Sequence, residues 1–289
     1  MVKAIRTTSF LDACIAAIAV RRRRAVPTVH HNLVCRNQRP YPLRPPGTPD
    51  CNPLPGSDST TRPDAPNRNA PIAMNIELAR QQMIEQQVHT WDVFDERVLE
   101  VMGQVKRERF APDAWRDTAF ADAAIPLLHG QSMLPPKVHG RILQALEVQP
   151  ADLVLEVGTG SGYLAACLGK LGRHVRTLEL YPDLAAFATT RLFEAAINNV
   201  AVETVDAMQL QEESRYDAIA VTGSLPLYDE RFQRALKPGG RLFVVVGAGP
   251  AMEAWKITRL GEREWQREGL FETVIQPLVN APRPSAFVF

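Results

Sequence analysis

Residues Leu153–Tyr163 read LVLEVGTGSGY, and this stretch decides the fold. Its leading apolar run predicts a buried strand. The three glycines that follow, Gly158, Gly160 and Gly162, let the backbone turn sharply and come close to a ligand. Apolar residues then recur at helical spacing, which predicts a helix over residues 162–172. A strand, a glycine-rich turn and a helix in this order are typical of the unit that holds a nucleotide-like ligand at the end of a parallel sheet.

The glycine spacing and the acid before it narrow the kind of ligand. Dinucleotide sites use G-x-G-x-x-G, whereas here the spacing is G-x-G-x-G and Glu156 precedes it. A carboxylate that faces the turn would repel a pyrophosphate and suit a cationic or amine-bearing ligand. The pattern E-x-G-x-G-x-G at a strand end resembles motif I of the S-adenosylmethionine-dependent methyltransferases. The alternative is a glycine-rich turn that binds nothing.

Two more acids close strand-like runs further along the chain. Glu179 lies at the end of residues 174–180, where a carboxylate would hold ribose hydroxyls; the alternative is an ordinary surface glutamate. Asp206 follows the run 200–205. Because successive parallel strands bring their carboxyl ends to one crevice, we expect these acids and Glu156 to face one ligand.

Predicted strands and helices alternate from Leu153 onward, which defines the fold class. The expected strands are 153–157, 174–180, 200–205, 217–222 and 241–247, and the expected helices are 162–172, 183–197 and 229–236. Two later runs, 254–260 and 264–274, predict an antiparallel pair. We therefore expect a doubly wound, mostly parallel α/β sheet of the Rossmann-like, class I methyltransferase kind, with an antiparallel C-terminal strand pair.

The sequence before this alternation predicts helices and one long loop. Asn75 can cap a first helix, and a second is expected over residues 95–103. Residues 105–143 form a mostly irregular stretch, and long ordered loops are usually functional. Its end carries Pro135 and Pro136, which suit the first turn of a further helix.

Residues 1–73 differ in composition from the rest of the chain. They hold 11 of the 23 prolines and 11 Lys and Arg against 4 Asp and Glu, a balance of +7, whereas the remainder balances to −6. Without an apolar period they cannot bury enough surface to offset chain entropy, so we expect a disordered Pro/Arg-rich tail. The alternatives are a transit peptide and a true start at Met74. We thus expect a methyltransferase domain over 74–289, with a helical and loop extension over 74–150.

Composition also restricts the partners. The negative balance of the domain argues against a nucleic-acid surface, and the apolar run Phe10–Val20 is too short to span a membrane. The four cysteines lack metal-ligand spacing, so we expect no metal and a reducing compartment. These features predict a cytoplasmic protein with neither nucleic acid nor a membrane as partner. We also expect a monomer, although the sequence does not determine the oligomeric state.

Several stretches besides motif I share the pattern of one enzyme family. They are ARQQMIEQQ (79–87), RERFAP (107–112), AFAD (119–122), IP (125–126), HGQS (129–132), YDAIAVT (216–222) and QPL (276–278). Together they resemble the protein-L-isoaspartate (D-aspartate) O-methyltransferases over about Asn75 to Val279. The resemblance implies protein repair, in which a methyl group passes from S-adenosylmethionine to the free carboxylate of an isoaspartyl residue in a damaged protein.

The resemblance also implies roles for particular residues. The cofactor site would comprise Glu156, Gly158, Gly160, Gly162, Glu179 and Asp206. The acceptor would lie against Gln131, Ser132 and Leu134, with Ser132 as the catalytic hydroxyl. Since a carboxylate is already a nucleophile at pH 7, the enzyme mainly has to align the reacting atoms.

Two departures from the family pattern bear on these roles. The family loop commonly has the form G-Q-T-[IM]-S-x-P, but Leu134 stands where its second hydroxyl, the active-site serine, is expected. Asp206 lies between Val205 and Ala207, where the family usually has two glycines. The alternatives are therefore a methyltransferase with another acceptor, or a protein that binds S-adenosylmethionine without turnover.

Three side chains near the loop could also take part in chemistry. His129 and His139 flank it, and either could act as a base, although lone histidines more often pack. Lys137 could attract a substrate carboxylate, although a solvated lysine on the first turn of a helix is the simpler interpretation.

Overall fold

The computed structural model describes residues 75–284, so the predicted tail lies outside the described residues. The described part begins with α1 (Ile76–Met83), which continues into a π-helical turn, Ile84–Val88. The side chain of Asn75 accepts the Leu78 N–H at 3.2 Å, as a helix cap should. α2 (Glu96–Gln104) follows, and both predicted N-terminal helices are confirmed.

The long stretch before the sheet contains short elements rather than open loop. In chain order they are α3 (Arg107–Phe110), a 3-10 helix (Asp113–Thr118), β1 (Ile125–Pro126), a 3-10 turn (Leu128–Gly130) and β2 (Ser132–Met133). β1 and β2 pair antiparallel as a small ribbon. The predicted helix then follows as α4 (Pro136–Leu146), with proline in its first turn.

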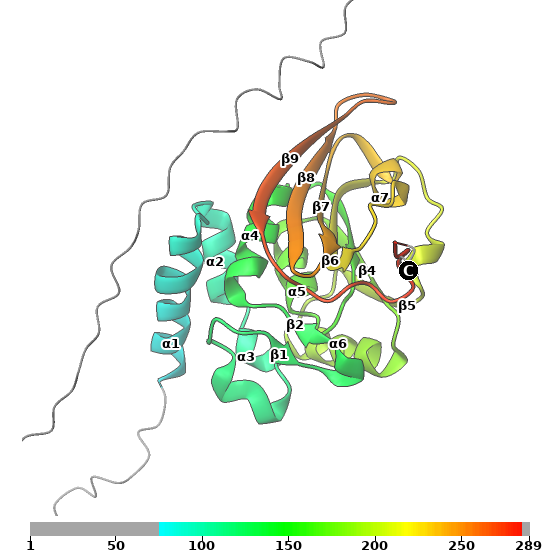
Figure 1. The fold of residues 1–289 in the computed structure, drawn as a ribbon. Coiled ribbons are helices and arrows are strands. Elements are labelled where there is room, and N and C mark those ends of the chain that lie inside the picture. The colour runs from blue at the N-terminus through cyan, green and yellow to red at the C-terminus, as the bar shows by residue number, and fades with distance from the viewer. Residues whose placement is uncertain (1–74, 285–289) are drawn as a thin grey trace, which may run out of the picture. The chain divides into compact units, whose positions relative to one another are not determined.

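A seven-stranded sheet forms the centre of the described chain (Figure 1). Its order is β5-β4-β3-β6-β7-β8-β9. The strands are β3 (Leu153–Val157), β4 (His174–Glu179), β5 (Val200–Thr204), β6 (Tyr216–Leu225), β7 (Leu236–Ala248), β8 (Ala251–Arg259) and β9 (Trp265–Glu272). β3 to β7 pair in parallel, whereas β8 and β9 pair antiparallel. This arrangement confirms the predicted fold class.

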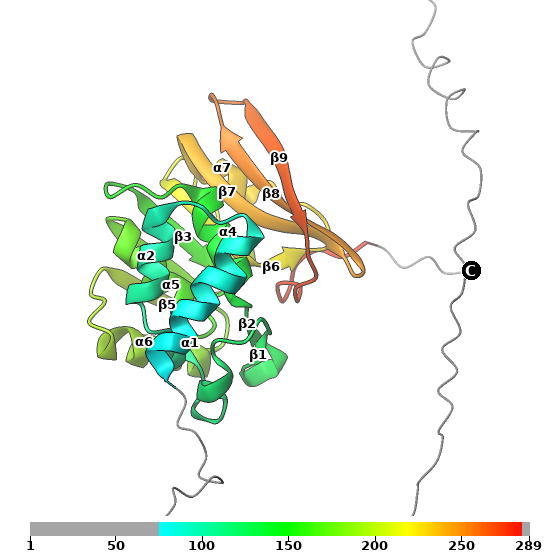
Figure 2. The same ribbon diagram turned by 90° about the vertical axis from the view of Figure 1, so that its left-hand side faces the viewer.

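The two faces of the sheet bury different clusters. Val154 packs in a cluster with residues of α2, α4 and α5 (Tyr163–Leu171), whereas the next residue, Leu155, packs on the opposite face with Phe232 of α7 (Arg231–Arg234). This alternation follows from the twofold side-chain period of a strand. Figure 2 shows α1, α2 and α4 in front of the sheet. α6 (Pro182–Glu194) connects β4 to β5.

Two details differ from the predicted elements. α7 is a four-residue helix rather than one over 229–236. β7 begins at Leu236, the last residue of that expected helix and five positions before the expected strand 241–247, because Leu236 pairs with Tyr216 before the register shifts. Gly239 accommodates this irregular start with a φ of 80°. Within residues 75–284, no helix is long and apolar enough to cross a bilayer.

Candidate active site

The strand order reverses at β3, which has β4 on one side and β6 on the other. Ligands of doubly wound sheets bind at such a switch point, outside the carboxyl ends of the strands. A cavity of about 740 Å³, including its open mouth, lies there, and we call it the first cavity. Ligand pockets commonly have volumes of about 300–1,000 Å³. Seven of the predicted site residues line the first cavity: Gln131, Ser132, Leu134, Gly158, Gly160, Glu179 and Asp206.

The glycine-rich turn approaches its neighbours so closely that side chains would not fit. Gly158 has a φ of 90°, and a Cβ there would lie 2.4 Å from Oγ1 of Thr222 on β6. That hydroxyl is 2.8 Å from the Gly158 carbonyl oxygen, to which it can donate. Gly162, with a φ of 82°, faces Ala188 of α6 and does not line the first cavity. Gly158 therefore shapes the cavity wall, whereas Gly162 permits close packing of two helices.

Glu179 ties the end of β4 to the glycine-rich turn. One carboxylate oxygen accepts the Gly160 N–H at 2.8 Å, and the other accepts the Tyr181 N–H at 3.1 Å. The residue is 5 % exposed and lines the first cavity. Because each carboxylate oxygen has two lone pairs, both can still accept a ligand hydroxyl.

Glu156 lies behind the turn and is not part of the cavity wall. It is fully buried, and one carboxyl oxygen accepts the Thr177 hydroxyl at 2.5 Å. The other oxygen has no hydrogen-bond partner among the described residues. Burial raises the pKa of this carboxyl to about 8, so at neutral pH it is mostly protonated. This placement differs from the expectation that a charged Glu156 faces the ligand.

Asp206 holds the loop that follows β5. One carboxylate oxygen accepts the Met208 N–H at 2.8 Å, and the other accepts the side-chain amide of Asn280 at 3.0 Å. Asp206 thereby links this loop to the segment after β9. It also lines the first cavity.

The β1–β2 ribbon presents the acceptor loop, which we define as residues 129–135. The Leu127 N–H donates to the Gln131 carbonyl at 2.8 Å, which closes the turn between the strands. His129 adopts a φ of 56° in that turn. Its ring stacks on Tyr181 with centroids 4.0 Å apart, and its Nε2 lies 2.8 Å from the Asp183 carboxylate. His129 therefore fastens the acceptor loop to the start of α6.

Arg107 supports the acceptor loop from inside the protein. It is fully buried, and its guanidinium donates to the carbonyls of Ala119 and Leu134, both at 2.7 Å. A third N–H lies 3.0 Å from Nδ1 of His139. Since arginine only donates, that nitrogen accepts and His139 is neutral. Burial, reinforced by the Arg107 charge, keeps the pKa of His139 well below its usual value.

A second cavity shares part of its wall with the first. Its volume is about 1,110 Å³ including open solvent, and Trp91, Lys137 and Val274 are among its walls. The Lys137 ammonium is 2.7 Å from Asp122 and 4.3 Å from the centre of the Trp91 ring. Four residues line both cavities: Gln131, Ser132, Leu134 and Gln276. We call these four residues the partition.

Sequence reasoning missed several residues of the site. Thr222 and Gln276 lie in stretches that carried the family resemblance, but no role was expected for either. Tyr181 lies two positions after Glu179, the predicted ribose ligand. This closeness in the sequence was the one local indication that Tyr181 belongs to the site. Arg107 had no local signal, because a cation in an exposed-looking RERF run gives no sign of being buried. Within residues 75–284, no three His, Cys, Asp or Glu side chains gather as metal ligands would.

The reversed strand order, the glycine-rich turn and the acids at the strand ends define a class I methyltransferase. The model of the family described as protein-L-isoaspartate(D-aspartate) O-methyltransferase matches residues 78–281, so the chain belongs to that family. Membership confirms the predicted enzyme class, a carboxyl O-methyltransferase that uses S-adenosylmethionine.

Individual proteins agree with this assignment. The chain is 40 % identical over 201 residues to the protein-L-isoaspartate O-methyltransferase of Rhodopseudomonas palustris, covering 69 % of this chain and 92 % of the relative. It is 35 % identical over 212 residues to the Koribacter versatilis enzyme of the same name, covering 73 % and 95 %. A Plasmodium falciparum structure described as a protein-L-isoaspartate O-methyltransferase, solved with S-adenosyl-L-homocysteine, superposes with a TM-score of 0.60. It covers 69 % of this chain and 97 % of that chain, and at 22 % identity the likeness shows the fold alone.

Proposed function

We propose that this chain methylates the free carboxylate of L-isoaspartyl residues across the partition, with S-adenosylmethionine in the first cavity and the damaged protein in the second. The observation that carries this proposal is that Gln131, Ser132, Leu134 and Gln276 line both cavities. A methyl donor on one side and an acceptor on the other would meet only there.

The residues of the first cavity fit the cofactor. Glu179 offers free carboxylate lone pairs for ribose hydroxyls, and Asp206 offers further acceptors in the cavity wall. The turn at Gly158 and Gly160 lets the ligand approach the backbone, because neither residue carries a Cβ. We propose these four residues as the cofactor contacts, with Glu156 and Gly162 supporting the turn from behind.

The methyl transfer requires no acid or base from the protein. Bound S-adenosylmethionine supplies an electrophilic methyl group, which moves to a carboxylate oxygen as the carbon–sulfur bond breaks and its electron pair stays on sulfur. The acceptor is already ionised at neutral pH, so no residue has to remove a proton. The chain's own contribution is to hold the acceptor in line and exclude water.

Ser132 and Lys137 are the proposed contacts of the acceptor. Ser132 lines both cavities and brings a hydroxyl that can donate to a carboxylate oxygen. Lys137 contributes positive charge to the wall of the second cavity, partly offset by Asp122. Leu134, two positions after Ser132, also lines both cavities but offers no side-chain donor.

A transfer assay with matched peptides tests the proposal. Radiolabelled S-adenosylmethionine is incubated with the full chain and either an isoaspartyl peptide or its normal aspartyl twin. We expect label, released as methanol by mild base, from the isoaspartyl peptide alone. Label on both peptides would overturn the isoaspartyl selectivity, and label on neither, with cofactor binding intact by calorimetry, would favour another acceptor or a binding protein without turnover.

We further propose that the chain acts as a cytoplasmic monomer that uses no nucleic acid. The net negative charge of residues 74–289 would repel phosphates. The free, buried thiol of Cys167 suits a reducing compartment. Light scattering after gel filtration should give the mass of one chain, 32.1 kDa; a dimer mass would contradict the proposal.

A further inference from the structure

The partition lacks a side-chain hydrogen-bond donor at position 134, but it contains the side-chain amide of Gln276, to which no role has yet been given. Leu134 stands where the family pattern has its second hydroxyl, and Gln276, which carries a side-chain amide, lines both cavities. Building on the proposed function, we propose that Gln276 binds the acceptor carboxylate and supplies the hydrogen bond that Leu134 cannot. Gln276 is then a specificity-determining residue of the acceptor site.

The backbone on either side of Gln276 is fastened to the end of β6. The Ser224 N–H donates to the Gln276 carbonyl at 2.9 Å, and the Leu278 N–H donates to the Ser224 carbonyl at 2.9 Å. Ile275, one residue earlier, is 8 % exposed and belongs to the core. Gly223 permits this close approach, since a Cβ there would lie 2.7 Å from the Leu278 side chain. The main chain that carries Gln276 is therefore held in place before any ligand binds.

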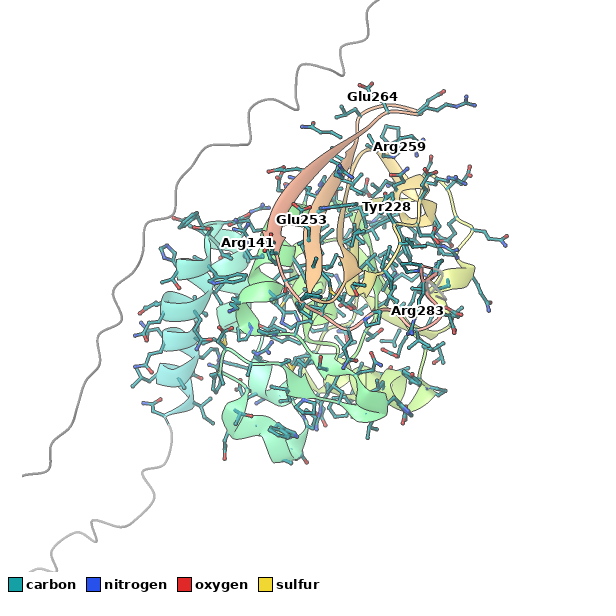
Figure 3. The ribbon with its side chains drawn as sticks, in the orientation of Figure 1. Arg141, Tyr228, Glu253, Arg259, Glu264 and Arg283 are labelled. Carbon is teal, nitrogen blue, oxygen red and sulfur yellow. The ribbon has the colours of Figure 1, made fainter. Side chains whose placement is uncertain are left out.

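The other end of this segment is held through β9. Figure 3 shows Arg141, on α4, beside the end of β9. Its guanidinium lies 5.1 Å from the centre of the Phe271 ring and donates to the Leu270 carbonyl at 3.4 Å. In Figure 1 the segment after β9, drawn in red, runs from there across the end of the sheet nearest β2. Both ends of the segment that carries Gln276 are thus anchored.

The side chain of Gln276, in contrast, is exposed and uncommitted. Among residues 75–284 its amide has no hydrogen-bond partner, whereas the Gln131 amide donates to the His129 carbonyl at 3.2 Å. An amide has two N–H donors, which suit a carboxylate oxygen. As a neutral donor it can add a hydrogen bond to the carboxylate without adding a further positive charge to that of Lys137, which lines the second cavity. The Ser132 hydroxyl and the Gln276 amide would then both donate hydrogen bonds to the acceptor carboxylate.

The test compares three variants of the full chain. Gln276→Ala removes the donor, and Gln276→Glu keeps the shape but replaces a donor with a negative charge. Gln266→Ala is the matched control, because Gln266 is an exposed glutamine on β9 outside both cavities. The readouts are the Kd of an isoaspartyl peptide for the complex with S-adenosylhomocysteine, measured by calorimetry, the kcat/KM, and the Kd of S-adenosylmethionine.

We expect Gln276→Ala to raise the peptide Kd about tenfold, as the loss of one hydrogen bond to a charged group predicts. Gln276→Glu should raise it more, and Gln266→Ala should leave it unchanged. Gln276→Ala and Gln266→Ala should leave the affinity for S-adenosylmethionine unchanged, whereas Gln276→Glu adds a negative charge to the wall of the first cavity and is compared by its peptide affinity alone. Adding Leu134→Ser to Gln276→Ala should restore part of the lost peptide affinity, because the hydroxyl replaces the missing donor.

Two results would overturn the inference in different ways. If the wild type binds and methylates the peptide but Gln276→Ala and Gln276→Glu match it, Gln276 has no acceptor role and the proposed function stands. If the wild type binds S-adenosylmethionine but neither binds nor methylates the peptide, the proposed function falls and this inference falls with it.

Discussion

Arg107 donates a hydrogen bond to the carbonyl of Leu134 at 2.7 Å, so a buried cation holds the acceptor loop from below. No carboxylate among the described residues pairs with it. Burial lowers the pKa of Arg107 to about 10, which still leaves it charged at neutral pH. The protein therefore stabilises a desolvated charge with carbonyls, a neutral histidine and the Tyr163 ring, 5.0 Å away.

We expect Arg107→Met to lower the free energy of unfolding by at least about 2 kcal/mol, because it leaves buried carbonyls without donors. Arg107→Lys should retain more stability yet still raise the KM for an isoaspartyl peptide, since one ammonium cannot span three acceptors. Urea unfolding and steady-state kinetics measure the two effects. Arg109→Met is the control, because Arg109 is exposed on the same helix; equal effects at both positions would contradict the supporting role.

The buried carboxyl of Glu156 predicts a pH-dependent stability. Its pKa is raised to about 8 in the folded protein, whereas an unfolded glutamate titrates near 4.3. Between these values the folded state holds a proton that the unfolded state has lost. Stability should therefore fall as pH rises through this window, by up to about 1.4 kcal/mol per pH unit.

Glu156→Gln isolates this effect because glutamine does not titrate. In ligand-free protein, the wild type should lose unfolding free energy relative to the variant between pH 5.5 and pH 8, as measured by urea denaturation. Parallel pH profiles for the two proteins would show that Glu156 is ionised throughout.

Replacing Glu179 should weaken cofactor binding. Glu179→Ala is expected to cost about 1.5–3 kcal/mol in S-adenosylmethionine affinity, the value of hydrogen bonds to a charged group. Glu179→Gln should cost less, because an amide oxygen can still accept the Gly160 N–H and keep the turn in place. Calorimetric titration gives both values, and an unchanged affinity in Glu179→Ala would exclude it as the ribose ligand.

A hydroxyl at position 134 should raise kcat/KM on an isoaspartyl peptide and lower the free energy of unfolding. Leu134 is 7 % exposed and packs in the core, so Leu134→Ser should lower the free energy of unfolding by about 2–5 kcal/mol, as core truncations of leucine do. A new donor should raise kcat/KM on an isoaspartyl peptide by about 10- to 100-fold. Leu134→Ala makes a similar cavity without a hydroxyl. If Leu134→Ala gives the same gain, the effect comes from space and not from a donor.

Residues 74–289 should suffice for folding and cofactor binding. All walls of both cavities lie between Trp91 and Val279. Deleting residues 1–73 should therefore leave both the Tm and the affinity for S-adenosylmethionine unchanged in thermal and calorimetric measurements. A large loss of either would make the tail part of the fold.

Local sequence determined the fold class and several residues that line the first cavity. The strand at 153–157 with its three glycines, and the acids Glu179 and Asp206 at the ends of later strands, could all be predicted. The reason is that side-chain period and turn residues act over a few positions. A parallel sheet then brings strand ends together whatever the loops between them contain.

Tertiary structure alone decided the remaining features. The pKa of Glu156 is raised because the core excludes water from its carboxyl group, and a pKa depends on surroundings that no short pattern contains. Arg107 reaches Leu134 across 27 positions, and Gln276 reaches the partition from the far end of the domain. Such contacts depend on how β9 and the ribbon pack against the sheet. Packing of that kind sums many weak, non-local interactions, so the acceptor site emerges only when the whole domain has folded.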